Sequence, residues 1–192
     1  MDTAQSDRAL DAKAEGVLRV LSDTSARAAA FTRAAGLACP VDCGACCRNP
    51  RVTTTSLEML PAAVMLLASG RAEKLLATLR EGGEGGEKLA GGVCALFDGR
   101  CSLYPGRPLV CRLFGSGARR SAHGKREFLG CALLREAADP AAVSEAIDLA
   151  PVAGESLGAL LALDPSDAVR ELPINDALRF ALERVLLDDS YR

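Results

Sequence analysis

The sequence predicts a mainly α-helical fold in which helices flank a small, irregular, cysteine-rich core with one short β-hairpin. Alanine and leucine dominate the 192-residue chain and only 4% of its residues are aromatic, a composition that favours helices over strands. Apolar residues recur at helical spacing near both ends of the chain. All eight cysteines lie between residues 39 and 131, and none lies in either end segment. The formal net charge of -2 is too small to suggest that net charge steers the protein to nucleic acid or a membrane.

The amino-terminal segment is predicted to be one long helix. An apolar face recurs at helical spacing and comprises Leu10, Ala14, Val17, Leu18 and Leu21. We expect the helix to continue through residues 26–35 and to end at Gly36, since glycine commonly follows the last helical residue.

A second helix is expected after the first cysteines. Thr55 followed three residues later by Glu58 resembles a capping box, but Pro61 conflicts with a helix interior, so the helix begins either at the capping box or at Pro61. Gly70 interrupts the pattern, which resumes over residues 72–79. The glycine-rich stretch 82–92 is predicted to be a flexible connector, because no Lys-Ser/Thr pair follows it as in a phosphate-binding loop.

A β-hairpin is predicted around Asp98-Gly99, which lies between short apolar runs. A two-residue turn there pairs Phe97 with Arg100, Leu96 with Cys101 and Cys94 with Leu103. Strand alternation then places Cys94 and Cys101 on the same face, where two sulfurs can reach a common ion or cluster.

The carboxy-terminal part is again predicted to be helical after Cys131. Asp139-Pro140 and Asp164-Pro165 both fit a helix N-cap followed by proline at the first helical position. The last helix carries an apolar face made of Ile174, Leu178, Ala181, Leu182 and Val185.

The eight cysteines of the chain allow three interpretations. The cysteines are Cys39, Cys43, Cys46, Cys47, Cys94, Cys101, Cys111 and Cys131. In the first, a cysteine is simply a small hydrophobic residue buried in the core. This explains one or two of the eight, but not those set among polar residues and glycine. Disulfides are disfavoured because residues 1–16 lack the apolar core of a secretory signal, and because no apolar stretch reaches the ~18 residues of a membrane span. We therefore expect a cytoplasmic protein, in which structural disulfides are rare.

Metal or iron–sulfur ligation is the interpretation that we favour. A cluster of thiolates repels itself unless a cation compensates its charge, and the short Cys43-Gly-Ala-Cys46 spacing lets both sulfurs reach one ion. Sulfur-only sites suit zinc or iron–sulfur clusters, and the spacing does not separate these two. Cys46 and Cys47 cannot point the same way from an extended backbone, so we expect them to serve different ions or irons, or one of them to be a free thiol.

Two stretches resemble the CxxCxxCC zinc- or iron-chelating family, also called YkgJ-like. They are Cys39-Pro-Val-Asp-Cys43-Gly-Ala-Cys46-Cys47-Arg48 and the run from Cys94 through Cys101-Ser-Leu-Tyr104-Pro-Gly-Arg107-Pro108-Leu-Val-Cys111-Arg112 to Phe114. The resemblance covers residues 39–131 and implies that the cysteines from Cys43 onward bind metal. Cys39 departs from the usual spacing by one residue, and Gly115 replaces a proline common in the family.

The segment from Gly99 to Arg126 contains seven basic residues and no acidic one. Cations stabilise nearby thiolates, so charge compensation is the simpler interpretation, and Arg107 and Arg112 are candidate cofactor-binding residues. The alternative is an acidic or peptide partner that docks beside the cluster; nucleic acid is disfavoured because few aromatics are available to stack on bases. His123, the single histidine, is expected in an exposed loop, and Tyr104 either donates to a sulfur or packs in the turn.

These observations predict three segments: an amino-terminal helical segment (1–36), a cysteine-cluster metal-binding domain (37–135) and a carboxy-terminal helical segment packed on it (136–192). The predicted function is binding of zinc or an iron–sulfur cluster through up to eight thiolates. The alternative is an iron–sulfur redox or protein-modifying enzyme that acts on an anionic or peptide substrate, since flagellin lysine methylases carry a similar cysteine motif. Whether the protein is an enzyme stays open.

Overall fold

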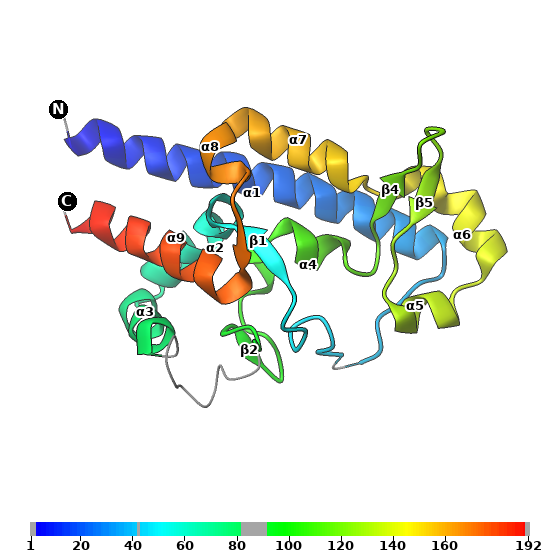
Figure 1. Ribbon diagram of the computed structural model, residues 1–192, viewed down its shortest axis with the longest axis horizontal. Coiled ribbons are helices and arrows are strands. Elements are labelled where there is room, and N and C mark those ends of the chain that lie inside the picture. Colours follow the sequence, from blue (N-terminus) through cyan, green and yellow to red (C-terminus); the bar gives the residue numbers. More distant parts are fainter. Residues whose placement is uncertain (1–2, 42, 82–91, 191–192) are drawn as a thin grey trace.

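The computed structural model describes residues 3–41, 43–81 and 92–190, and it confirms the mainly α-helical prediction (Figure 1). The α-helices in this part of the chain are α1 (Thr3–Ala34), α2 (Ser56–Ala68), α3 (Ala72–Glu81), α4 (Leu109–Leu113), α5 (Ala132–Ala137), α6 (Pro140–Ala146), α7 (Ala153–Leu163), α8 (Pro165–Ala168) and α9 (Ile174–Asp189). The same residues also form two short 3-10 helices: η1 (Tyr104–Gly106) precedes α4, and η2 (Ile147–Leu149) lies between α6 and α7. No helix in the described ranges is long and apolar enough to cross a membrane.

Helix α1 runs along one side of the molecule and packs against α2, α4, α7 and α9 (Figure 1). Its predicted end is confirmed, since Gly36 has a φ of 63°, a conformation that glycine adopts without steric cost. The predicted N-caps of α6 and α8 are also confirmed: the Asp139 carboxylate accepts from Ala141 N–H, and the Asp164 carboxylate accepts from Ser166 N–H.

Helix α2 begins at the capping box, so the alternative start at Pro61 is wrong. The Thr55 hydroxyl accepts from the Glu58 N–H, as a capping box requires. A proline inside a helix costs about 3 kcal/mol. Burial of Leu57, Leu60 and Leu66, each at most 1% exposed, offsets this cost, because a fully buried leucine contributes roughly 1.5–3 kcal/mol.

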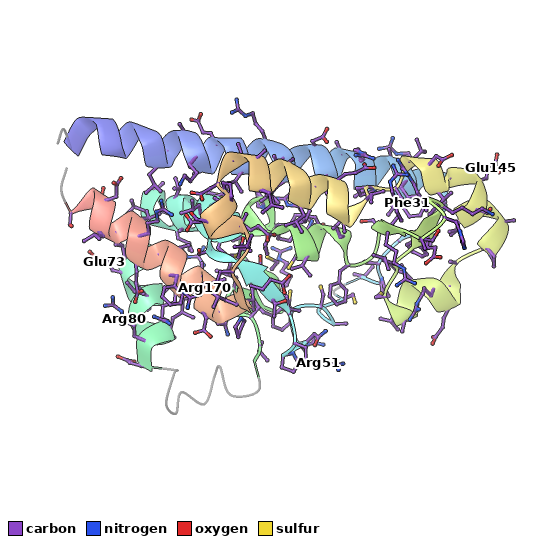
Figure 2. The ribbon with its side chains drawn as sticks, turned by 45° about the horizontal axis from the view of Figure 1, so that its top comes forward. Phe31, Arg51, Glu73, Arg80, Glu145 and Arg170 are labelled. Atoms are coloured by element: carbon purple, nitrogen blue, oxygen red, sulfur yellow. The ribbon has the colours of Figure 1, made fainter. Side chains whose placement is uncertain are left out.

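The main core lies where α1, α2 and α9 pack together, and it combines residues from both ends of the chain. Leu21 of α1, Leu57 of α2 and Leu178 of α9 are all fully buried in it. A second, smaller core forms at the far end of α1, where the Phe31 ring meets the Phe128 ring edge-on at 5.4 Å. Figure 2 shows Phe31 at this end, well away from Glu73 and Arg80 of α3.

Three two-stranded antiparallel sheets occur in the described residues, so the prediction of one hairpin was incomplete. Strand β1 (Thr53–Thr55) pairs with β6 (Glu171–Pro173), which joins the segment after the first cysteines to the start of α9. Strand β4 (Ala118–Arg120) pairs with β5 (Arg126–Phe128) in a second hairpin. The sheets are small, and they connect loops to the helices.

The predicted hairpin is present as β2 (Phe97–Asp98) and β3 (Arg100–Cys101), but its predicted register is wrong by one residue. Phe97 pairs with Cys101, and Asp98 pairs with Arg100. Gly99 alone forms the tip, because its φ of 69° allows a tighter reversal than the two-residue turn that we expected.

Candidate metal centre

Six cysteines from three separate segments line one cavity of about 750 Å³. Its thiols come from the loop before β1, from the β2–β3 hairpin region and from α4, and they are Cys43, Cys46, Cys47, Cys94, Cys101 and Cys111. All eight cysteines of the chain are free thiols, so none is used in a disulfide. The cavity is the only place where the described segments bring so many of the predicted ligands together.

The loop that carries Cys46 and Cys47 is a tight turn rather than extended chain. The Arg48 N–H donates to the Gly44 carbonyl at 3.1 Å, and the Asn49 N–H donates to the Cys46 carbonyl at 3.3 Å. Gly44 is required here, because an added Cβ would lie 2.5 Å from the Phe97 ring. The small residues between the cysteines therefore allow the loop to fold against the hairpin.

Cys46 and Cys47 lie on the same cavity, so the extended backbone that we assumed for them is wrong. The Cys47 thiol donates a hydrogen bond to the Cys46 sulfur, which lowers the pKa of Cys46 to about 6. The same hydrogen bond, together with burial, raises the pKa of Cys47. Whether the two sulfurs serve different ions stays a prediction.

Cys94 lies in a turn that hydrogen bonds hold in place, not in a strand as we predicted. The Cys94 N–H donates to the Cys47 carbonyl at 3.0 Å, which joins the two cysteine segments. The Asn175 side chain of α9 accepts from the Ala95 N–H and donates to the Val93 carbonyl, each at 2.9 Å. Sequence reasoning missed Asn175, since nothing in the local pattern links it to a residue some 80 positions earlier.

Cys111 is positioned by α4, whose first turn is tied to the main core. The buried Glu58 carboxylate accepts from the Leu109 N–H at 2.7 Å and from the hydroxyl of Thr55, the N-cap of α2, so one side chain joins the starts of α2 and α4. Burial raises the pKa of Glu58 and raises the pKa of Cys111 to about 12. Burial likewise raises the pKa of Cys94.

Cys39 and Cys131 do not line the six-cysteine cavity. An added Cβ on Gly115 would lie 3.9 Å from the Cys39 sulfur, and the Cys131 N–H donates to the Phe114 carbonyl beside Gly115 at 3.1 Å. Burial raises the pKa of Cys39, and the nearby charges of Cys43 and Cys131 raise it further. Cys39 therefore lies close enough to both Cys43 and Cys131 to interact with them electrostatically.

Arg107 is the cation most closely associated with the thiols. It lines the six-cysteine cavity, its guanidinium carbon lies 3.4 Å from the centroid of the Tyr104 ring, and its charge favours the thiolate forms of Cys46 and Cys111. The Tyr104 ring, itself 61% exposed, thus packs on the arginine.

Arg112 is placed differently. Its guanidinium donates to the Arg107 carbonyl, the Ser25 hydroxyl and the Pro105 carbonyl, so it fastens η1 and α4 to α1. Burial, together with the neighbouring charge of Arg107, lowers its pKa to about 10.

Much of the predicted basic segment is already paired. Arg119 donates to the Glu127 carboxylate at 2.8 Å, Arg120 donates to the Glu155 carboxylate at 2.7 Å, and Arg126 donates to the Ala150 carbonyl at 2.9 Å. His123 is exposed in the β4–β5 turn, as expected. The glycine-rich connector over residues 82–91 lies outside the described residues.

The thiols of the cavity suit a soft metal by their chemistry, but their sulfur atoms do not surround a common position where an ion could bind. Within residues 3–41, 43–81 and 92–190, no group of three or more His, Cys, Asp or Glu side chains is placed so that it could hold a metal ion. Six thiols and no histidine line the cavity, and such a set fits zinc or an iron–sulfur cluster by its chemistry. Holding either would require the cysteine segments to close inward.

Residues 38–132 match the family model CxxCxxCC, described as "Putative zinc- or iron-chelating domain". The matched region contains all eight cysteines and the segments that form the cavity. No curated protein and no solved structure matches the chain.

Proposed function

Residues 38–132 belong to the CxxCxxCC family of zinc- or iron-chelating domains, and from this premise we propose that the six-cysteine cavity binds zinc or an iron–sulfur cluster. The observation that carries the proposal is the convergence of six free thiols from three segments on one cavity. The proposed ligands are these six cysteines, with Cys39 and Cys131 as candidates for a second set shared with Cys43. A cytoplasmic location, which keeps thiols reduced, is part of the proposal.

Metal binding explains why so many thiols lie together. Each raised thiol pKa, such as that of Cys111, means that the neutral form is favoured in the absence of a cation. A bound metal displaces these protons, so its affinity falls as the pH is lowered. Arg107 supplies part of the compensating positive charge, and in this proposal it helps to bind the cofactor beside the thiolates.

The alternative is a redox or protein-modifying enzyme that uses an iron–sulfur cluster. The observation that favours it is the size of the cavity, since about 750 Å³ is within the range of ligand pockets, roughly 300–1,000 Å³, and Arg100 and Arg107 lie on its wall. An anionic or peptide substrate would meet these two guanidinium groups next to the cluster.

Anaerobic purification of the untagged protein, followed by metal and acid-labile sulfide analysis and an absorption spectrum, tests the proposal. Colourless protein with about two zinc ions per chain, as two four-sulfur sites would hold, supports a structural or carrier role. Brown protein with iron and sulfide supports the alternative. Folded protein that contains neither metal, with all eight thiols titratable, would contradict both.

Serine variants assign the ligands. Cys94→Ser and Cys101→Ser are expected to lower the bound metal by at least one ion per chain, because both thiols line the cavity. Ser116→Ala is a matched control, since its buried hydroxyl donates to the Arg112 carbonyl and takes no part in the cavity. Unchanged metal content in both cysteine variants would exclude the cavity as the binding site.

A further inference from the structure

A second cavity, of about 510 Å³, lies on the other side of the η1 turn from the six-cysteine cavity. The two cavities share Tyr104, Pro105, Arg107 and Cys111 in their walls, so the turn separates them. One wall of the second cavity is the α1 face that carries Ala28 and Ala29. Its volume lies within the range of small-molecule pockets.

The two permanently charged side chains that line the second cavity are both arginines. Arg107 and Arg112 both line it and lie near enough for their charges to repel each other. None of the described residues that line it is acidic. Two neighbouring guanidinium groups in a partly buried site, without a carboxylate on the same wall, favour an anion as the occupant.

Arg107 is the group with bonding capacity to spare. The Arg112 guanidinium is already used in three hydrogen bonds to protein oxygens. Among the described residues, no hydrogen bond or ion pair engages the guanidinium of Arg107, and its buried Nε is likewise without a partner. A planar guanidinium with a free Nε–H matches the two oxygens of a carboxylate.

The rest of the lining is mostly apolar, which selects the body of the ligand. Ala28, Ala29, Leu37 and Leu134 contribute hydrocarbon surface. The hydroxyls of Thr32 and Ser116 donate to backbone carbonyls, so they do not supply the several donors that a phosphate group requires. An aliphatic chain with one carboxylate fits this combination better than a polyanion.

We propose that this second cavity binds a small aliphatic carboxylate, with Arg107 pairing its carboxylate group and the α1 alanines contacting its chain. The bound acid lies beside the Cys39 and Cys111 thiols, which also line the cavity. The carboxylate comes either from a free acid or from the last residue of a peptide. The inference goes beyond the metal site and does not require the six-cysteine cavity to be filled.

Isothermal titration calorimetry with hexanoate tests the inference on the full-length protein, with metal content measured in the same preparation. Saturable binding is expected, and the neutral isostere hexanamide and inorganic phosphate are each expected to bind at least tenfold more weakly. Arg107→Gln is expected to weaken hexanoate binding at least tenfold. N-acetyl-leucine is the peptide mimic: tighter binding than hexanoate identifies a peptide end as the source, and weaker binding identifies a free acid.

A second variant protects the test against misfolding of Arg107→Gln. Ala29 is exposed on α1 and lines the cavity, so Ala29→Leu fills the cavity without disturbing the core and is expected to weaken binding several-fold. Ala26→Leu, on an exposed position of α1 outside the cavity, and Arg119→Gln, in the β4–β5 hairpin, are the matched controls. Absence of saturable hexanoate binding, or equal affinity in Ala29→Leu and Ala26→Leu, would overturn the inference while metal content still reports separately on the proposed function.

Discussion

The helical frame and the cysteine segments of this protein are held in place by different interactions. In the frame, α1, α2 and α9 bury whole leucine side chains against one another, and their backbone groups are paired within the helices. The cysteine segments contain turns and very short strands, and a few specific hydrogen bonds position them, among them Cys94 N–H to the Cys47 carbonyl.

This difference indicates how folding and function are divided. We expect burial of the frame to drive folding without a metal, because hydrophobic burial is the dominant favourable term in folding. The cysteine segments have fewer such contacts, so their placement depends on individual hydrogen bonds and on the metal or cluster that the thiols bind. Substitutions in the frame should therefore change stability, whereas substitutions near the thiols should change metal content more than stability.

Leu178→Ala in α9 is expected to have the largest effect on stability. The side chain is fully buried in the main core, and Leu→Ala in such a position typically costs about 2–5 kcal/mol. Urea unfolding followed by circular dichroism measures the loss. Leu187→Ala in the same helix is the control, because Leu187 is 60% exposed and its replacement should change the free energy of unfolding by less than about 0.5 kcal/mol. Equal losses in both variants would contradict this description of the frame.

Gly44→Ala tests the cysteine turn. The new Cβ would meet the Phe97 ring at 2.5 Å, so the turn or the ring must shift, and such overpacking typically costs about 1–3 kcal/mol. We expect the bound metal per chain to fall as well. Gly158→Ala in α7 is the matched control, since nothing lies within 4 Å of its added Cβ, and it should leave metal content unchanged. Full metal content in Gly44→Ala would show that the turn does not position ligands.

Asn175→Ala removes the two hydrogen bonds by which the Asn175 side chain of α9 joins the helical frame to the segment that contains Cys94. It leaves the Ala95 N–H and the Val93 carbonyl without their partner, a loss of about 1–3 kcal/mol if both groups stay buried. Metal affinity, measured by competition with a chelator, should fall because Cys94 lies between the two released groups. Thr78→Ala is the comparison, since the exposed Thr78 hydroxyl donates only to the Lys74 carbonyl of its own helix α3. Equal affinities in the two variants would argue against a positioning role for Asn175.

The frame was largely predictable because its signals are local. Gly36 ended α1 as expected, and Asp139 and Asp164 capped their helices as expected. The start of α2 required a choice between two local signals, Thr55 and Pro61, which only tertiary burial decided. The β1–β6 pair was missed because three-residue strands 118 positions apart leave no local pattern.

The site was predictable in its residues but not in its geometry. Family resemblance and cysteine spacing identified the thiols, and six of the eight meet on one cavity. The separation of Cys39 and Cys131 from the other six was not predictable, because it depends on how segments that are distant in the sequence pack together. The same holds for Arg112, whose hydrogen-bond partners come from α1 and from η1.

Glu58→Gln should have a smaller effect, seen in the pH dependence of stability. Burial raises the pKa of Glu58 above its ordinary value, so the folded state keeps the proton at pH values where the unfolded chain has released it. The stability that Glu58 contributes is therefore complete below the unfolded pKa, about 4.3, and is lost as the pH rises through the folded pKa. Glutamine carries no charge and still accepts from Leu109 N–H, so the variant should lack this decline.

Urea unfolding of wild type and Glu58→Gln between about pH 4 and pH 7 measures the difference. Glu73→Gln, at an exposed position of α3, is the control and should follow the wild type at every pH. Parallel curves for Glu58→Gln and wild type would mean that the carboxylate is not penalised by burial.

X-ray absorption at the edge of the bound metal examines the thiolate ligands themselves. If the cysteine cavity holds the metal, the first shell consists of sulfur, roughly four atoms per zinc ion near ~2.3 Å. The chain contains one histidine, which is exposed in the β4–β5 turn. A first shell of nitrogen or oxygen near ~2.0–2.1 Å would therefore mean that the metal is bound elsewhere and that the cysteine cavity has another purpose.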